Sequence, residues 1–118
     1  MSIINKEKEF VSYVVELMQS IGLVNAIRMF GGHGIFLDGL MFGIIVDNIL
    51  YLKADKETCE EFKEKGLPPF SYMKQGKKMK LNYYQAPEEA LEDPEEMNYW
   101  ANRAYGVALK AGALKRKK

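Results

Sequence analysis

Two-residue turns between short apolar runs constrain the fold of this chain more than any other feature. Asp38-Gly39 separates the run 35–37 from the run 41–46, and Asp47-Asn48 separates the latter from 49–53. Asp, Asn and Gly tolerate the positive φ angles that a tight β-hairpin requires. The sequence therefore predicts a three-stranded antiparallel meander. Its middle strand is apolar on both faces, so we expect it to be central and covered.

A second hairpin is predicted around Gln75-Gly76, which separates 70–74 from 77–84. Leu67-Pro68-Pro69 forces an extended entry into this hairpin. Because successive side chains of a strand point to opposite faces, we expect its second strand to have a core face and a solvated basic face. The core face comprises Met79, Leu81 and Tyr83, and the basic face comprises Lys78, Lys80, Asn82 and Tyr84.

Amphipathic patterns with end signals predict a first helix over 6–21 and a second over 56–65. We place Glu7 and Glu9 in the first turn of the first helix, where carboxylates favour the helix dipole. Asp55 is the expected cap of the second helix. Gly22 and Gly66 are the expected ends of these two helices.

A third helix is predicted to begin at Asp93-Pro94 and to end at Gly112, followed by a flexible basic tail over 113–118. Its core face comprises Met97, Trp100, Ala101, Ala104, Val107 and Ala108. The predicted order is α-β-β-β-α-β-β-α. Runs of adjacent strands flanked by helices indicate an α+β fold, with helices packed on an antiparallel sheet. We expect a single domain over 1–118.

Composition excludes several classes of protein. The chain has 118 residues, 47% of them hydrophobic and 28% charged, which indicates a globular domain rather than a disordered segment. The longest apolar run, 40–46, is far too short to cross a membrane. A single cysteine and an N-terminus unlike a signal peptide favour a cytoplasmic protein. The net charge of +1 argues against a dedicated high-affinity nucleic-acid binder.

The residues that could carry chemistry are sparse, and we expect no catalytic, cofactor-binding or metal-binding residue. Gly31-Gly32-His33-Gly34 has no helix after it and no lysine nearby, so it indicates a close backbone approach rather than a phosphate loop. His33 and Cys59, the only histidine and cysteine, cannot supply the four ligands of a structural zinc site. A small enzyme that uses His33 or Cys59 is the weakest alternative, because Cys59 falls on an apolar stripe with Phe62.

Basic and aromatic residues interleave along the second hairpin and recur at the C-terminus. Such a surface could bind nucleic acid through phosphate contacts and stacking, or a protein partner. An ordinary edge hairpin, on which lysines discourage aggregation, has the same composition. The candidate contact residues are Lys74, Lys77, Lys78, Lys80, Tyr72, Tyr84, Lys115 and Arg116.

A series of motifs runs through most of the chain. The motifs are Arg28-Met29-Phe30-Gly31-Gly32-His33-Gly34-Ile35-Phe36, Asp38-Gly39, Phe42-Gly43-Ile44-Ile45-Val46-Asp47, Leu50-Tyr51-Leu52-Lys53, Pro69-Phe70-Ser71-Tyr72, Tyr83-Tyr84-Gln85-Ala86-Pro87, Leu91-Glu92-Asp93-Pro94 and Trp100-Ala101. In this order, from about Phe10 to Val107, the chain resembles the N-terminal domain of the TfoX/Sxy family of bacterial competence regulators. Full-length members add a helical C-terminal domain, and we expect this chain to be a stand-alone form without it.

The resemblance implies a domain like that of type III secretion chaperones, without enzymatic activity or cofactor. It also implies a regulator of DNA-uptake genes that cooperates with the cyclic-AMP receptor protein at promoters. Our leading hypothesis is therefore an accessory regulator that acts by protein–protein contact in transcription control. The alternative is a module that binds nucleic acid directly through the basic hairpin. We also expect a homodimer, because the predicted sheet has few strands and two faces, and the first helix can cover only part of them.

Overall fold

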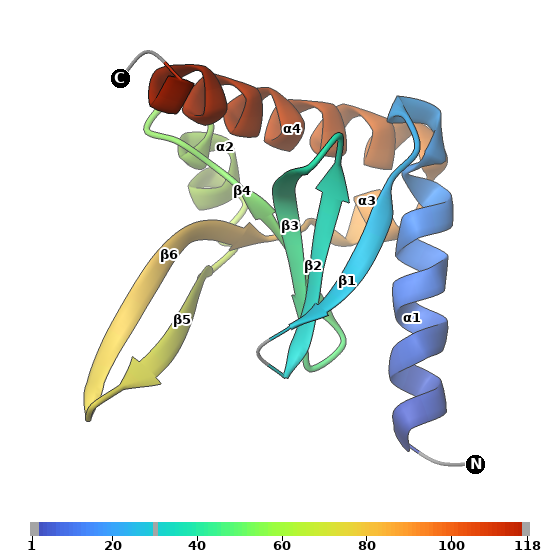
Figure 1. Ribbon diagram of the computed structural model, residues 1–118, viewed down its shortest axis with the longest axis horizontal. Helices are drawn as coiled ribbons and strands as arrows, with labels where there is room; N and C mark the ends of the chain where they lie inside the picture. The colour runs from blue at the N-terminus through green and yellow to red at the C-terminus, as the bar shows by residue number, and fades with distance from the viewer. Residues whose placement is uncertain (1–2, 30, 117–118) are drawn as a thin grey trace.

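A six-stranded antiparallel sheet forms the centre of the molecule (Figure 1). The computed structural model describes residues 3–29 and 31–116. Neighbouring strands follow the order β1-β2-β3-β4-β6-β5, so the first four form a meander and the last two a hairpin. The strands are β1 (Asn25–Met29), β2 (Gly32–Leu37), β3 (Leu40–Val46), β4 (Ile49–Lys53), β5 (Pro69–Lys74) and β6 (Lys77–Gln85).

All three predicted two-residue turns are confirmed. Both residues of each turn have positive φ, between 51° and 80°. This conformation matches the right-handed twist of the flanking strands. The residues are Asp38 and Gly39, Asp47 and Asn48, and Gln75 and Gly76.

The meander has four strands rather than the predicted three. The additional strand is β1, an edge strand that the sequence pattern does not predict, because its residues Asn-Ala-Ile-Arg-Met show no alternation of polar and apolar side chains. The pattern also predicts that the following strand begins at Ile35, whereas β2 begins at Gly32 and pairs with β1 through Met29 and Gly32. A Cβ atom on Gly32 would overlap the carbonyl oxygen of Ile45, so the expected close backbone approach at the glycine-rich stretch is confirmed.

Helices cover one face of this sheet (Figure 1). They are α1 (Ile3–Leu17), the 3₁₀ turn η1 (Gln19–Ile21), α2 (Cys59–Glu64), α3 (Glu88–Glu92) and α4 (Pro94–Arg116). Val14 and Met18 from the N-terminal segment and Met97 and Trp100 from α4 are buried against the sheet. All six residues predicted for the core face of the last helix are buried. The α+β class with an antiparallel sheet is therefore confirmed.

Several helix ends differ from the prediction. Because α1 begins at Ile3, its first turn contains no acidic residue, and Glu7 lies further along the helix. The last helix continues past Gly112 to Arg116, so most of the expected tail 113–118 is helical, while 117–118 lies outside the described residues. An interior glycine costs a helix only about 1 kcal/mol and does not by itself end it.

Asp55 caps a turn that precedes α2, so this helix begins at Cys59 rather than at the predicted position 56. Its Oδ1 accepts the main-chain N–H groups of Glu57 and Thr58 at 3.0 and 2.8 Å. These two hydrogen bonds hold the pKa of the Asp55 carboxyl below its usual value, with the Thr58 N–H the largest cause. Cys59 and Phe62 both pack against the core, as predicted.

Candidate functional site

The distal part of the β5–β6 hairpin projects away from the rest of the molecule (Figure 1). Strand β4 pairs with β6 only through Tyr83, Tyr84 and Gln85, so residues 77–82 continue beyond the end of that pairing. Met79 and Leu81, predicted to lie in the core, are instead 40% and 38% exposed. The side chains of the strand alternate as predicted, but none of the described helices packs over Met79 and Leu81.

The strand register divides the hairpin into two surfaces. Tyr72 lies opposite Met79, Met73 opposite Lys78, and Ser71 opposite Lys80. Residues directly opposite each other share a face, and the face alternates along each strand. We call Tyr72, Met79 and Leu81 the inner face, and Met73, Lys78 and Lys80 the outer face.

All charged residues of the hairpin are basic. Residues 69–85 contain four lysines and no aspartate or glutamate. All four lysines, Lys74, Lys77, Lys78 and Lys80, are exposed. Within the described residues none of these lysines forms an ion pair, and Lys74 lies directly opposite Lys77 at the tip. Like charges at this spacing repel each other, so an incoming negative group would relieve an existing cost.

The other predicted contact residues are not all brought to this place. Tyr72 lies among the lysines and is 38% exposed. Tyr84 lies at the far end of β6, where its ring stacks on Phe62 at a centroid distance of 5.4 Å. Lys115 and Arg116 occupy the last turn of α4, and their side chains lie outside the described residues.

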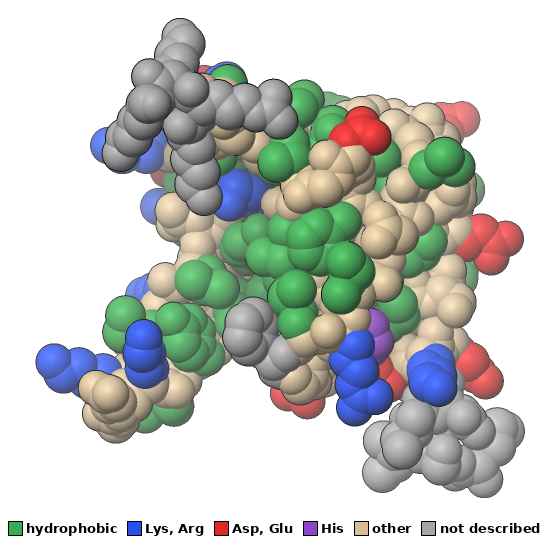
Figure 2. Space-filling model, viewed as in Figure 1, with side chains coloured by type: hydrophobic (Ala, Val, Ile, Leu, Met, Phe, Trp, Pro, Cys, Tyr) green, Lys and Arg blue, Asp and Glu red, His purple; other side chains and the backbone are tan. Residues whose placement is uncertain are grey.

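A hollow of about 410 Å³ lies beside the inner face, on the sheet surface away from the core cluster. Its apolar lining comprises Met29, Met41, Ile44, Val46, Tyr51, Phe70, Tyr72 and Leu81. Figure 2 shows hydrophobic side chains both over the middle of the sheet and along the hairpin. This hollow was not predicted from the sequence, although a signal for it is present there. The strand over 41–46 is apolar on both faces, and the described helices cover only one of them.

Asp47 is the single acidic residue in the lining of the hollow. Tyr51, on the adjacent strand, has a pKa raised by burial and by the negative charge of Asp47. Burial also raises the pKa of Tyr83 to about 12. Both phenols are therefore neutral at ordinary pH, and Asp47 supplies the only negative charge of the hollow.

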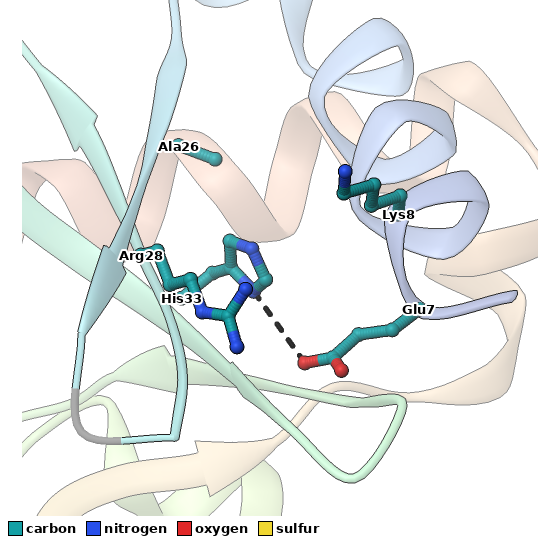
Figure 3. Close-up of a pocket in the computed structure, with 5 residues that line it drawn as sticks. All are labelled: Glu7, Lys8, Ala26, Arg28 and His33. Atoms are coloured by element: carbon teal, nitrogen blue, oxygen red, sulfur yellow. Dashed lines mark ion pairs between the residues drawn. The ribbon is translucent and has the colours of Figure 1, made fainter. Parts of the chain in front are cut away.

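His33 and Cys59 are engaged in separate local contacts. His33 Nδ1 lies 3.6 Å from Glu7 Oε1, next to a pocket of about 270 Å³ that Lys8, Ala26 and Arg28 also line (Figure 3). The thiol of Cys59 donates to the Lys56 carbonyl oxygen at 3.4 Å. No hydrogen bond joins His33 to Cys59 in the described part of the chain, so the two do not form a nucleophile–base pair here.

Metal-binding clusters and membrane-spanning helices are both absent from the described residues. Over the described ranges 3–29 and 31–116, no three His, Cys, Asp or Glu side chains gather as they would around a metal ion. In the same part of the chain, no helix combines the length and apolarity that a membrane span requires. The basic hairpin and the hollow beside it are thus the two surfaces that stand out.

Comparison with known proteins identifies a family that matches most of this chain. The TfoX N-terminal domain family matches residues 16–108, which include every strand and most of α4. The DNA transformation protein TfoX1 of Aliivibrio fischeri (strain ATCC 700601 / ES114) is 32% identical over 82 residues, covering 70% of this chain. The chain spans 37% of the length of that relative. It therefore belongs to the TfoX N-terminal domain family.

Proposed function

We propose that this chain is a cytoplasmic, non-enzymatic accessory regulator of DNA transformation that acts through protein–protein contact in transcription control. Membership of the TfoX N-terminal domain family supports a role in DNA transformation, and so does the name of the relative, DNA transformation protein TfoX1. The outer face of the hairpin supports the mode of action. It is a projecting surface that no described helix covers.

The observation that carries this proposal is the position of Met73 between lysines. Met73 is 68% exposed and lies directly opposite Lys78, with Lys80 two residues further along the same strand face. An apolar centre flanked by positive charge fits a partner protein that offers an apolar contact and acidic side chains around it. The partner that the family resemblance suggests is the cyclic-AMP receptor protein.

Binding to that protein can be measured directly. Purified cyclic-AMP receptor protein, loaded with cyclic AMP, is immobilised and titrated with the wild-type chain and with the double variant Lys78→Glu/Lys80→Glu. We expect the variant to bind at least about tenfold more weakly, because two attractive contacts become repulsive. The matched control is Lys6→Glu/Lys8→Glu on α1, which changes the formal charge equally and should bind like wild type.

Absence of binding by the wild-type chain would refute this partner. Equal binding by both double variants would refute the outer face as the contact surface. Far-UV circular dichroism of each variant checks that the fold is retained. We expect this because the four lysines substituted in the two variants are all exposed.

A second candidate function is direct binding of nucleic acid, favoured by the four exposed lysines on a hairpin without an acidic residue. A two-stranded ribbon can enter the major groove of DNA, with its lysines on phosphates. Fluorescence anisotropy of a labelled duplex at low and physiological salt tests this function. Binding that falls steeply with salt, and that Lys78→Glu/Lys80→Glu abolishes, would support it; a flat titration at low salt would exclude it.

A further inference from the structure

The sheet surface opposite the helices is apolar over most of its width. Met29 of β1, Met41 and Ile44 of β3, and Tyr51 of β4 all line the hollow, and none of them belongs to the core cluster. Ile27 of β1 is 46% exposed near this surface. Met29, Met41 and Tyr51 are half-buried and Ile44 is buried, so this surface is an apolar recess with an exposed isoleucine near it. An apolar recess that no described helix covers is a suitable place for an apolar group of a partner.

The same chain carries a projection that suits this hollow. Tyr72 and Met79, a cross-strand pair of the inner face, are 38% and 40% exposed toward the tip of the hairpin. Together they present an aromatic ring and a flexible thioether, which adapt well to a lining rich in Met, Ile and Val. One molecule therefore has an apolar recess of about 410 Å³ and an apolar pair at its edge. Tyr72 also lines the recess of its own copy, whereas Met79 lies outside that lining and is 40% exposed.

We propose that two copies of this chain pair through these surfaces, with the hairpin of each copy packed across the open sheet face of the other. Met79 of one copy then enters the hollow of its partner, and the Tyr72 rings, which line the two hollows, pack at the contact between the copies. A two-fold axis makes the contact self-complementary, because each copy supplies one projection and one recess. This dimer uses the inner face, so it leaves the outer face free for the contact under "Proposed function" and does not depend on it.

The charges also favour a second copy as the occupant. A formal net charge of +1 gives little long-range repulsion between two molecules. Locally, Lys74 and Lys77 flank the inner face at the tip, and Asp47 is the acid in the recess that would receive them. A nucleic acid could neutralise the lysines, but its polyanionic backbone is poorly suited to fill a recess lined by Met41, Ile44 and Val46 and bordered by Asp47.

The size of the contact is realistic for this molecule. A standard interface takes about 800 Å² from each partner. That is about a tenth of the 7846 Å² of accessible surface of this chain. The exchange of hairpins therefore needs to bury about a tenth of the surface of each copy.

Sedimentation velocity tests the pairing. The wild-type chain, examined from about 1 to about 200 µM, should shift from 13.5 kDa toward about 27 kDa. The variant Tyr72→Thr/Met79→Thr should remain at 13.5 kDa throughout, since it removes the projecting pair while keeping residues suited to a strand. The matched control is Met73→Thr on the outer face, which should dimerise like wild type.

A second experiment tests the arrangement. A photoreactive phenylalanine analogue at position 79 is activated in an equal mixture of unlabelled and ¹⁵N-labelled protein. Mass spectrometry should find crosslinks between the two isotopic forms, joining position 79 to the peptide that contains Met41–Val46. Crosslinks within one isotopic form only, or at the outer face, would overturn the exchange of hairpins.

A wild-type chain that stays monomeric at the highest concentration would overturn the dimer itself, as would a dimer unaffected by Tyr72→Thr/Met79→Thr. Salt separates this proposal from the contact with an acidic partner. An apolar interface should persist in about 1 M NaCl, where contacts that depend on the outer-face lysines are screened.

Discussion

Gly32 of β2 and Ile45 of β3 lie so close that a Cβ atom on Gly32 would overlap the Ile45 carbonyl oxygen. Gly32 is buried and has no positive φ, so the constraint is one of space rather than of backbone conformation. It begins the strand that places His33 beside Glu7 and Ile35 in the core. The glycine-rich stretch is thus a packing feature of the sheet.

We expect Gly32→Ala to lower the free energy of unfolding by about 2–3 kcal/mol, because the neighbouring strand must move to make room. The matched control is Gly106→Ala in the middle of α4, where an added Cβ would have no neighbour within 4 Å. That change should raise stability by about 0.5–1 kcal/mol through helix propensity. Urea unfolding measures both variants, and equal effects of the two would contradict the steric explanation.

A cluster of three aromatic rings joins α2, β6 and α4. The Phe62 ring lies 5.4 Å from that of Tyr84 and 5.1 Å from that of Trp100, measured between centroids. Phe62→Ala should therefore cost about 3–5 kcal/mol in the free energy of unfolding, while Phe62→Leu, which nearly fills the space, should cost about 1–2 kcal/mol. Thermal unfolding followed by near-UV circular dichroism checks this. A small effect of Phe62→Ala would show that α2 does not contribute to the core.

Tyr83 should make the protein sensitive to alkali. Burial raises its pKa to about 12, against about 10 in an unfolded chain. The neutral phenol is thus favoured by folding, so this contribution is fully present below about pH 10 and is lost as the pH rises toward about 12. We expect the stability of wild type to fall more steeply over this range than that of Tyr83→Phe. Parallel pH profiles of the two proteins would contradict the burial effect.

Sequence patterns sufficed where a local signal determines the structure. Gln75-Gly76 and the two earlier turns specify positive φ through residue type, and Asp93 begins the last helix by accepting the Glu95 N–H at 3.1 Å. The apolar face of α4 follows from helical periodicity alone. The interactions that form these elements are between residues a few positions apart, so they can be predicted from the sequence.

Features that depend on long-range contacts could not be predicted from sequence patterns. The edge strand β1 has no periodic signal, and its strand state comes from pairing with β2. Met79 and Leu81 alternate as a core strand would, yet their exposure depends on where the helices end in space. The hollow could not be predicted for the same reason. An apolar residue such as Ile44 is compatible both with a face covered by helices and with an uncovered apolar recess, and the sequence does not distinguish the two.

Asp55 should make stability depend on acid, in the opposite sense to Tyr83. The N–H groups of Thr58 and Glu57 lower its pKa from the ordinary 3.8, so the charged carboxylate is favoured by folding. This contribution is present above about pH 4 and is lost as the pH falls below it, through the lowered pKa of the folded protein.

Asp55→Ala should cost about 1 kcal/mol near pH 7, the usual value of a capping interaction. Asp55→Asn keeps an oxygen acceptor without the charge and should cost less. Urea unfolding at pH 7 and near pH 2 compares the three proteins. The gap between wild type and Asp55→Asn should close at the lower pH, where the wild-type carboxyl becomes neutral. A gap of constant size would show that the hydrogen bonds to Asp55 act by geometry alone, without a contribution from its charge.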